Sequence, residues 1–440
     1  MKKIHLSYSS NVHPAESLDE LSASLREFVA PISRAAFGDA LAAANLRIGM
    51  KQADELLTHG PLPSNSYLSD DILKAPPSPA CAAFLKTLDD TKLDVVSINA
   101  FPIRDFHAPR VKEQVYSPPW TDGGRALYSL KIAKVLTHFM ARPGIDRKVA
   151  AISVPSGVFT GLYPDSDEVR SQCAHFITEC TRELLRLERL TGRTVQLGLE
   201  PEPFTTGERI VDFIDYFKII LADARGKFPA QLGVSREQAE AIARKFVTIN
   251  FDLCHQAVEY EDCVEELKRL RAAGITISGI HISAALKLAE PAKNTAAFEH
   301  LKALDEPRYL HQVIARTHSN VIQRFEDLPH LWTPRKLKGQ SLSDFAELRC
   351  HFHVPLFADL SGPLTTTRDC VTPAIRYALQ ENLTDNFVAE TYTWNVLAQL
   401  AQSGNVAAQS VVGRVSGALN LDIREGIARE LKWSAQVLGL

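Results

Sequence analysis

The chain has 440 residues, of which 45% are hydrophobic and 23% are charged, and its formal net charge is −3. These are ordinary values for a globular protein, and the length suits one large domain with insertions or two domains. Nucleic-acid-binding proteins usually carry a basic face. The net charge gives no reason to expect a nucleic-acid partner, although it does not exclude a local basic patch.

The cysteines and the first residues of the chain indicate where in the cell the protein is expected. Seven cysteines are scattered along the sequence without a CxxC pair, which favours reduced thiols over a zinc ribbon or a disulfide scaffold. Residues 1–8 include two lysines but no apolar stretch of signal-peptide type. No apolar run approaches the ~18 residues that a membrane helix needs. We therefore expect a soluble, cytoplasmic protein without a transmembrane segment.

Apolar runs of strand length recur along the chain with helical patterns between them. This alternation is typical of a parallel α/β fold. The runs predicted to be strands are residues 4–8, 46–50, 94–99, 149–154, 195–200, 247–252, 277–282 and 386–390. Eight strands is the number that a closed (β/α)₈ TIM barrel requires.

Capping signals mark the starts of several helices between these strands. Ser17 and Glu20 form a predicted capping box ahead of an apolar stripe, and Ser235 and Gln238 form another. Asp262 is expected to cap a helix that ends near residue 274.

The predicted organisation is one elaborated barrel, since no internal repeat or clear linker is present. Residues 1–400 would form the TIM barrel, with an insertion at about 284–385 that contains a strand-like segment at 350–357. Residues 401–440, rich in Ala, Val and Leu at helical spacing, would form a helical C-terminal extension packed on the barrel.

Four of the predicted strands end in side chains that bind divalent metals: Glu200, Asp252, His281 and Glu390. In a TIM barrel the C-terminal ends of the strands meet at one mouth, so these side chains would lie close together. A mixed oxygen and nitrogen set suits manganese, zinc, cobalt or magnesium. Any one of them alone is more often a solvated acid or a core histidine, but their joint order favours a metal site.

Neighbouring residues leave alternatives open at this mouth. Glu202 lies two residues beyond Glu200, on the same face of an extended segment, and is a rival ligand or a substrate contact. His255 follows Asp252 at the spacing of one helical turn.

Polar residues in the loops after the third and seventh strands also face the mouth. His107, Lys112 and Arg308 are candidates to bind substrate, and Lys112 or Arg308 would suit an anionic or polyhydroxylated molecule. For each of them, a solvated surface position is the simpler alternative.

The order Glu, Asp-x-x-His, His, Glu on successive strands resembles the xylose-isomerase-like barrel superfamily, which includes ketose 3-epimerases, inosose dehydratases and endonuclease IV nucleases. The resemblance implies that Glu200, Asp252, His281 and Glu390 bind one divalent metal. It further implies that Glu200 and Glu390 are the catalytic acid/base pair and that His255 contacts the substrate.

The nuclease relatives imply a second metal site in the same region. His351 and His353 lie on one face of an extended segment, where those relatives carry an Asp-x-His that helps to hold an additional zinc. A second metal would be held by His255 and His353 with Asp252 bridging, although a contact from His353 to substrate is preferred. The nuclease ligands on the third and fourth strands are replaced by residues 99–102 and 153–155, which disfavours phosphodiester cleavage.

More narrowly, nearly the whole chain resembles the EboE family of metabolite-traffic proteins. The matching stretches are residues 5–8, 11–14, 111–122, 199–203, 252–259, 308–312, 351–356 and 390–394. This resemblance implies a link to the biosynthesis or traffic of secondary metabolites, without a defined reaction.

The sequence thus predicts a metal-dependent enzyme of isomerase or epimerase type, which moves a proton next to a carbonyl of a small oxygenated metabolite. The alternatives are a zinc-dependent hydrolase with one or two metals, or a non-catalytic metabolite carrier on the same fold. The paired glutamates favour an enzyme over a carrier, and a homo-oligomer is left open.

Overall fold

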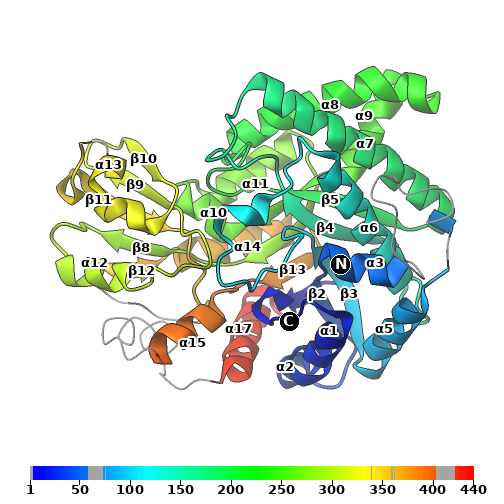
Figure 1. Cartoon of the computed structure of the whole chain (residues 1–440), viewed down its shortest axis with the longest axis horizontal. Helices are drawn as coiled ribbons and strands as arrows, with labels where there is room; N and C mark the ends of the chain where they lie inside the picture. The colour runs from blue at the N-terminus through cyan, green and yellow to red at the C-terminus, as the bar shows by residue number, and fades with distance from the viewer. Residues whose placement is uncertain are drawn as a thin grey trace.

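Eight parallel strands form a barrel at the centre of the protein (Figure 1). The computed structural model describes residues 3–57, 73–74, 76–337, 339–357, 360, 362–402 and 422–440. The barrel strands are β1 (His5–Tyr8), β2 (Ala42–Arg47), β3 (Leu93–Asn99), β4 (Val149–Pro155), β5 (Thr194–Glu200), β6 (Val247–Asp252), β7 (Ile277–Ile282) and β13 (Asn386–Ala389). They pair in the order β1-β13-β7-β6-β5-β4-β3-β2, and a parallel bridge between Ser9 and Asn45 joins the two ends. The predicted (β/α)₈ TIM barrel is therefore confirmed.

One strand lies earlier in the chain than predicted. The second strand was expected at 46–50, but β2 ends at Arg47, and Met50 begins helix α3 (Met50–Leu57). The strand starts with three alanines, which have weak strand propensity and gave no local signal. Parallel pairing with β3 holds this segment in the sheet.

The inner face of the barrel is polar near the C-terminal ends of the strands. Side chains alternate along a strand, so on β6 Asn250 and Asp252 face the interior while Ile249 and Phe251 belong to the hydrophobic core. The alternation brings carboxylates to the mouth without exposing the apolar residues between them.

Gly279 on β7 lets two interior asparagines approach the strand that carries His281. A Cβ atom at this position would lie 2.7 Å from Asn250 Oδ1 and 2.8 Å from Asn386 Nδ2. No larger residue fits without displacing these amides, so the close packing of the interior depends on this glycine.

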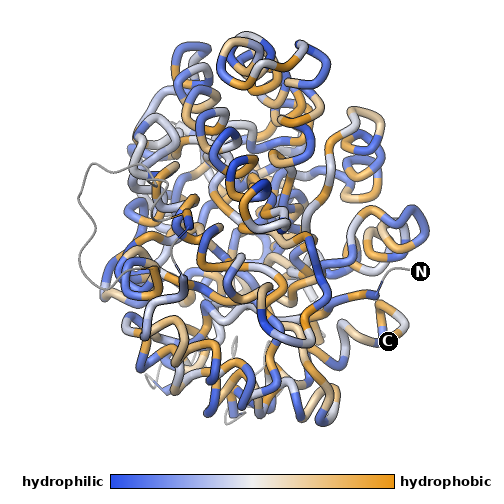
Figure 2. The backbone as a smooth tube through the Cα atoms, turned by 90° about the vertical axis from the view of Figure 1, so that its right-hand side faces the viewer, coloured by the Kyte–Doolittle hydropathy of each residue, from blue (hydrophilic) through white to orange (hydrophobic). Residues whose placement is uncertain are grey.

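Helices surround the barrel, and hydrophobic and hydrophilic stretches alternate along the chain in Figure 2. They are α1 (Leu18–Ser24), α2 (Ala30–Phe37), α3, α5 (Pro79–Asp90), α6 (Gly123–Met140), α7 (Asp167–Thr191), α8 (Ile210–Leu232), α9 (Arg236–Phe246), α10 (Leu253–Val258), α11 (Cys263–Ala272), α14 (Val371–Gln380), α15 (Trp394–Gln402) and α17 (Ile423–Leu438). Within the described residues, none of these helices has the length and apolar character needed to cross a membrane.

The predicted helix caps are confirmed. Reciprocal capping boxes link Ser17 with Glu20 at α1 and Ser235 with Gln238 at α9. The Asp262 side chain accepts hydrogen bonds from two backbone N–H groups at the start of α11. Local hydrogen bonding therefore sets these boundaries, as the sequence indicates.

The long segment between β7 and β13 folds into a second sheet beside the barrel (Figure 1). Its antiparallel strands are β8 (Leu286–Ala289), β9 (Val313–Thr317), β10 (Ile322–Phe325), β11 (Phe345–Cys350) and β12 (Leu364–Thr366), with α12 (Thr295–Lys302) and α13 (Pro334–Leu337) in the connections. Arg324 on β10 binds Glu259 (2.6 Å) and Glu208 (3.2 Å). These ion pairs tie the second sheet to loops at the barrel mouth.

The strand expected at 350–357 lies earlier in the chain, because β11 covers Phe345–Cys350 and residues 351–357 form no strand. Beyond it, the His351 amide donates to Gln312 O (2.8 Å) and the Val354 amide donates to Ala284 O (3.0 Å). These bonds lead the chain away from the second sheet and across the barrel mouth, and Pro355 has no N–H for a strand ladder.

The C-terminal helix α17 packs beside α2, α14 and β1. Much of the stretch expected to be a helical extension, residues 403–421, lies outside the described residues. Glu430 on α17 is buried and accepts hydrogen bonds from Thr391 Oγ1 (2.7 Å), the Leu356 amide (3.0 Å) and Trp394 Nε1 (3.3 Å). This carboxyl joins the helix to the loop that follows Glu390.

Glu430 is expected to make stability fall as pH rises. Burial raises its pKa to about 7, although its three donors oppose the shift, and the ordinary value is 4.5. Between these values the folded protein holds a proton that the unfolded chain has lost, so the contribution is full below 4.5 and is lost as pH rises through 7. We expect the free energy of unfolding, measured with urea, to fall between pH 5 and pH 8 in the unmodified protein. In Glu430→Gln this fall should be smaller, by up to about 3 kcal/mol. An equal drop in both proteins would show that another group is responsible.

Candidate metal and substrate site

The four predicted metal ligands lie together at the barrel mouth. The ligand atoms of Glu200, Asp252, His281 and Glu390 are within 4.8 Å of one another, and all four side chains are buried. His281 Nδ1 lies 3.2 Å from Glu200 Oε1 and 3.4 Å from Asp252 Oδ2, and it also contacts Glu390 Oε2. The imidazole is thus surrounded by three carboxylates.

Each side chain reaches this point from the end of its own strand. Glu200 and Asp252 are the last residues of β5 and β6, His281 is the penultimate residue of β7, and Glu390 follows β13. The strand register pairs Asp252 with His281, so a shift of one residue would turn the ligands out of the barrel.

Glu200 is held more firmly than Glu390. Its Oε2 accepts hydrogen bonds from Ser153 Oγ and from Asn250 Nδ2 (3.0 Å), which leaves Oε1 directed to the cluster. The Asn250 amide nitrogen also lies 3.0 Å from His281 Nε2 and so contacts both ligands. These two polar residues on β4 and β6 orient the first carboxylate and the imidazole.

Asp252 has one satisfied and one unsatisfied oxygen. Its Oδ1 accepts hydrogen bonds from Ser283 Oγ (2.7 Å) and from the His255 amide (3.0 Å), and so caps α10. Its Oδ2 is buried without a hydrogen-bond partner and faces His281. A buried carboxylate oxygen without a partner is costly, and a cation beside it would remove that cost.

The charges in the cluster also fit a divalent cation. Burial opposes a positive charge on His281, but Glu390 and Glu200 outweigh it and raise its pKa well above the ordinary value. Burial likewise opposes ionisation of Asp252 and Glu200, yet the neighbouring histidines lower the pKa of both. Three carboxylates around one imidazole hold excess negative charge, which suits manganese, zinc, cobalt or magnesium.

A pocket opens above the cluster. Its floor is polar and its walls are largely aromatic and aliphatic. The lining residues are Asn11, Asn99, Phe101, Pro102, Phe106, Val111, Lys112, Val115, Tyr116, Glu200, Glu202, His255, Tyr309, Leu310, Gln312, His351, His353, Glu390 and Tyr392. An apolar lining with a few polar groups is typical of small-molecule binding sites.

Glu202 lies in the pocket wall, in a hydrogen-bond network away from the four-residue cluster. It accepts hydrogen bonds from Tyr116 OH and from Gln312 Nε2 (3.2 Å). Burial raises its pKa to about 7, partly offset by His255 and Tyr116. The spatial grouping therefore favours Glu200 over Glu202 as the ligand.

His255, His351 and His353 share one hydrogen-bond pattern. Each has Nδ1 facing an oxygen that only accepts: Pro201 O (3.0 Å), Gln312 Oε1 (2.8 Å) and Glu390 O (2.7 Å), respectively. In the neutral rings Nδ1 therefore carries the hydrogen and Nε2 has a free lone pair.

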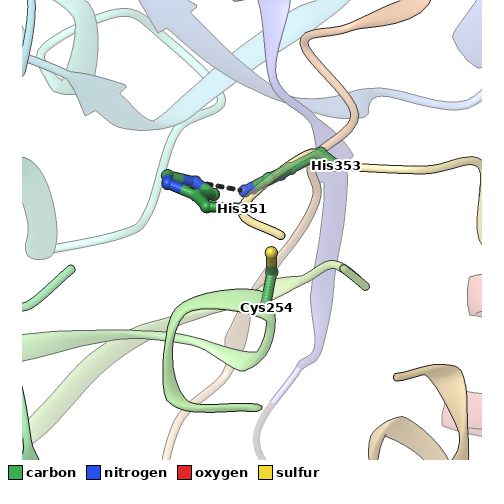
Figure 3. A group of neighbouring side chains, drawn as sticks. All are labelled: Cys254, His351 and His353. Atoms are coloured by element: carbon green, nitrogen blue, oxygen red, sulfur yellow. Dashed lines mark hydrogen bonds between the residues drawn. The ribbon is translucent and has the colours of Figure 1, made fainter. Parts of the chain in front are cut away.

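Two of these lone pairs face each other, because the Nε2 atoms of His351 and His353 are 3.2 Å apart. Figure 3 shows the sulfur of Cys254 pointing toward the same two rings, and the ligand atoms of the three residues lie within 4.8 Å of one another. Asp252, His255 and His353 form another group of this kind. Fixed Nδ1–H donors and convergent Nε2 atoms are typical of metal-binding histidines.

Of the other three residues predicted to bind substrate, one lines the pocket and two do not. Lys112 lines the pocket, but its Nζ is 2.6 Å from Asp327 Oδ2. Arg308 is not among the lining residues and packs over the ring of Tyr309. His107 also lies outside the lining, near Glu16 and the exposed Asp105.

Sequence reasoning did not single out several residues of the site. Tyr116, Gln312 and Tyr392 line the pocket, Asn250 supports two ligands, and Cys254 points to the histidine pair. The strand alternation that predicts Asp252 also predicts Asn250 on the same face. Cys254 lies on the short helix α10, and Tyr116 ends a short 3-10 helix. Gln312 and Tyr392 lie in the insertion and in a loop, where no periodic pattern indicates an orientation.

Comparisons with known proteins add little at the level of sequence. No family model matches the chain, and no curated protein matches it. Among solved structures, a similarity extends to the probable 3-DHS dehydratase AsbF, involved in petrobactin synthesis, from Bacillus anthracis. That match covers 95% of this chain and 100% of the other, with 11% sequence identity and a TM-score of 0.41. A likeness at this level assigns neither an activity nor a substrate, and the resemblance to the EboE family stays a prediction.

Proposed function

We propose that the protein is a divalent-metal-dependent enzyme that moves a proton next to a carbonyl of a small oxygenated metabolite, as an isomerase, epimerase or dehydratase does. The observation that carries this proposal is the buried group of Glu200, Asp252, His281 and Glu390, in which one Asp252 oxygen has no hydrogen-bond partner. The donor set and the eight-stranded barrel also support membership of the xylose-isomerase-like superfamily.

The two glutamates would have different roles in the proton transfer. Both glutamates line the pocket, but Glu200 is fixed through Oε2 by Ser153 and Asn250, and neither of these residues donates a hydrogen bond to the Glu390 side chain. Glu390 is therefore the better placed carboxylate to take a proton from substrate. Glu200 would face the substrate from β5, which β6 and β7 separate from β13. When bound, a divalent cation would polarise the substrate carbonyl and stabilise the charge that develops on its oxygen.

The test is exchange of carbon-bound hydrogen in D₂O. The metal-loaded protein is incubated with a panel of α-hydroxyketones, and loss of the C–H signal beside the carbonyl is followed by NMR. We expect exchange with at least one ketone, and none after removal of metal with EDTA. Metal binding without exchange of any panel member would contradict the proposal.

A second candidate, metal-assisted hydrolysis, is favoured by one observation. The convergent Nε2 atoms of His351 and His353, with His255 and Asp252 close by, are suited to a second metal ion. Hydrolysis of bis-(4-nitrophenyl) phosphate by a protein with two metals per chain, lost in His353→Ala, would support this candidate over the first.

A link to secondary-metabolite biosynthesis or traffic follows from the EboE resemblance and belongs to the same proposal. The partner expected at this site is a small metabolite and not a nucleic acid. A non-catalytic carrier is the third alternative. The exchange experiment separates it from the proton-transfer enzyme, and the phosphodiester assay separates it from the hydrolase.

A further inference from the structure

We infer that the pocket selects an uncharged substrate that carries its oxygen atoms at one end and an apolar ring or chain along the rest. This rests on the proposed function in one respect, because the oxygenated end is placed against the four-residue cluster. The inference about the rest of the substrate depends on the walls alone.

The charges of the lining disfavour an anionic substrate. Among the described residues that line the pocket, Lys112 is the only lysine or arginine. Its ammonium group is already paired with Asp327, and both side chains are largely buried, at 7% and 13% exposed. A phosphate or carboxylate on the body of the substrate would therefore enter beside Glu202 with no free lysine or arginine in the lining to bind it.

The walls present aromatic surface. Phe106 and Tyr309 pack with their ring centroids 4.8 Å apart, and Tyr309 meets Tyr392 at 5.2 Å. Elsewhere in the lining, Phe101 packs against Tyr116 at 5.6 Å. Such surfaces bind flat or aliphatic groups through burial of apolar area.

Most polar groups on these walls already have protein partners. The Tyr309 hydroxyl donates to Phe106 O (3.1 Å), and Tyr116 OH donates to Glu202. Gln312 uses its amide nitrogen for Glu202 and its oxygen for His351. A polyol carries a hydroxyl on every carbon, and several of these hydroxyls would find no partner on the walls. Each unpaired hydroxyl weakens binding by about tenfold or more.

Two groups remain to bind a polar atom on the body of the substrate. Asn11 lines the pocket, is 4% exposed, and has a buried Oδ1 without a hydrogen-bond partner. In the part of the chain that the structure describes, the Tyr392 hydroxyl has no hydrogen bond. The walls thus accommodate one or two polar groups, with a donor opposite Asn11.

The experiment compares three probes by calorimetry with the full chain loaded with manganese. They are 2-hydroxyacetophenone, which joins an α-hydroxyketone to a phenyl ring, D-fructose, and dihydroxyacetone phosphate. We expect the Kd of the aryl ketone to be at least about tenfold lower than that of either other probe. Phe106→Ala should weaken binding of the aryl ketone about tenfold and leave hydroxyacetone, which has the same head group, within about twofold.

Equal or tighter binding of fructose or of the phosphate by the unmodified protein would overturn the inference, whether or not Phe106→Ala folds. The same titrations after EDTA treatment test the substrate class separately from the proposed function. The preference for the aryl ketone arises from the pocket walls, so it should persist even though the affinity for every probe falls. A preserved preference in a protein that binds no metal would refute the metal-dependent reaction alone. Metal-dependent exchange with preferred binding of fructose would refute the substrate class alone.

Discussion

Asp252→Asn is expected to abolish the stabilisation of the protein by divalent metal. In the unmodified protein, saturation with manganese or zinc at about 1,000 times the Kd should raise the free energy of unfolding by about 4 kcal/mol. Asp252 supplies the buried oxygen that has no hydrogen-bond partner, and its loss removes one of three negative charges around His281. The measurement is thermal unfolding with metal and with EDTA.

The same substitution is expected to lower the stability of the metal-free protein at neutral pH, because the histidines around Asp252 hold its pKa well below the ordinary value and so favour its charged form in the folded state. The metal-induced shift is therefore measured for each protein against its own metal-free form. Asp39→Asn, at an exposed side chain, is the matched control and should retain the full metal effect. A metal-induced shift that survives in Asp252→Asn would place the cation elsewhere.

Glu390→Gln should lower the rate of proton exchange about 10²- to 10⁴-fold, the usual contribution of a positioned acid or base. An amide cannot accept the proton, but it retains an oxygen for the cluster and nearly the same shape. Substrate binding, measured by calorimetry with the aryl ketone, should change far less than the rate. This difference between binding and turnover identifies Glu390 as the group that moves the proton.

The control for this substitution is Glu168→Gln, at an exposed residue near the start of α7, which should have no effect on exchange. Metal content must be measured beside the rate, because Glu390 is also in the ligand group. If Glu390→Gln exchanged at the parental rate while binding metal, the acid/base assignment would be wrong. If it lost both metal and exchange, Glu390 would be acting first as a ligand.

The barrel and the four-residue cluster at its mouth could be predicted because both follow from local patterns in the sequence. Glu200, Asp252, His281 and Glu390 each end an apolar run, and the geometry of a parallel barrel requires such ends to meet. The capping boxes likewise involve residues three positions apart. The second strand was misplaced because alanines carry little strand signal and only pairing with β3 defines it.

The pocket walls could not be predicted in the same way. Gln312 contacts Glu202 and His351 from the insertion, and these contacts depend on how the second sheet meets the barrel. Lys112 is a reasonable anion-binding residue by sequence, but a residue more than 200 positions away, Asp327, neutralises it. Such long-range pairs set the charge of the site and have no local signature.

The most direct test of the account is the number of metal ions per chain, measured by elemental analysis after reconstitution with manganese or zinc and gel filtration. The structure-based proposal predicts about one tightly held ion in the unmodified protein and almost none in His281→Ala, whose imidazole lies among all three carboxylates. A protein that retains no metal, or a His281→Ala variant that retains as much as the parent, would contradict the central claim.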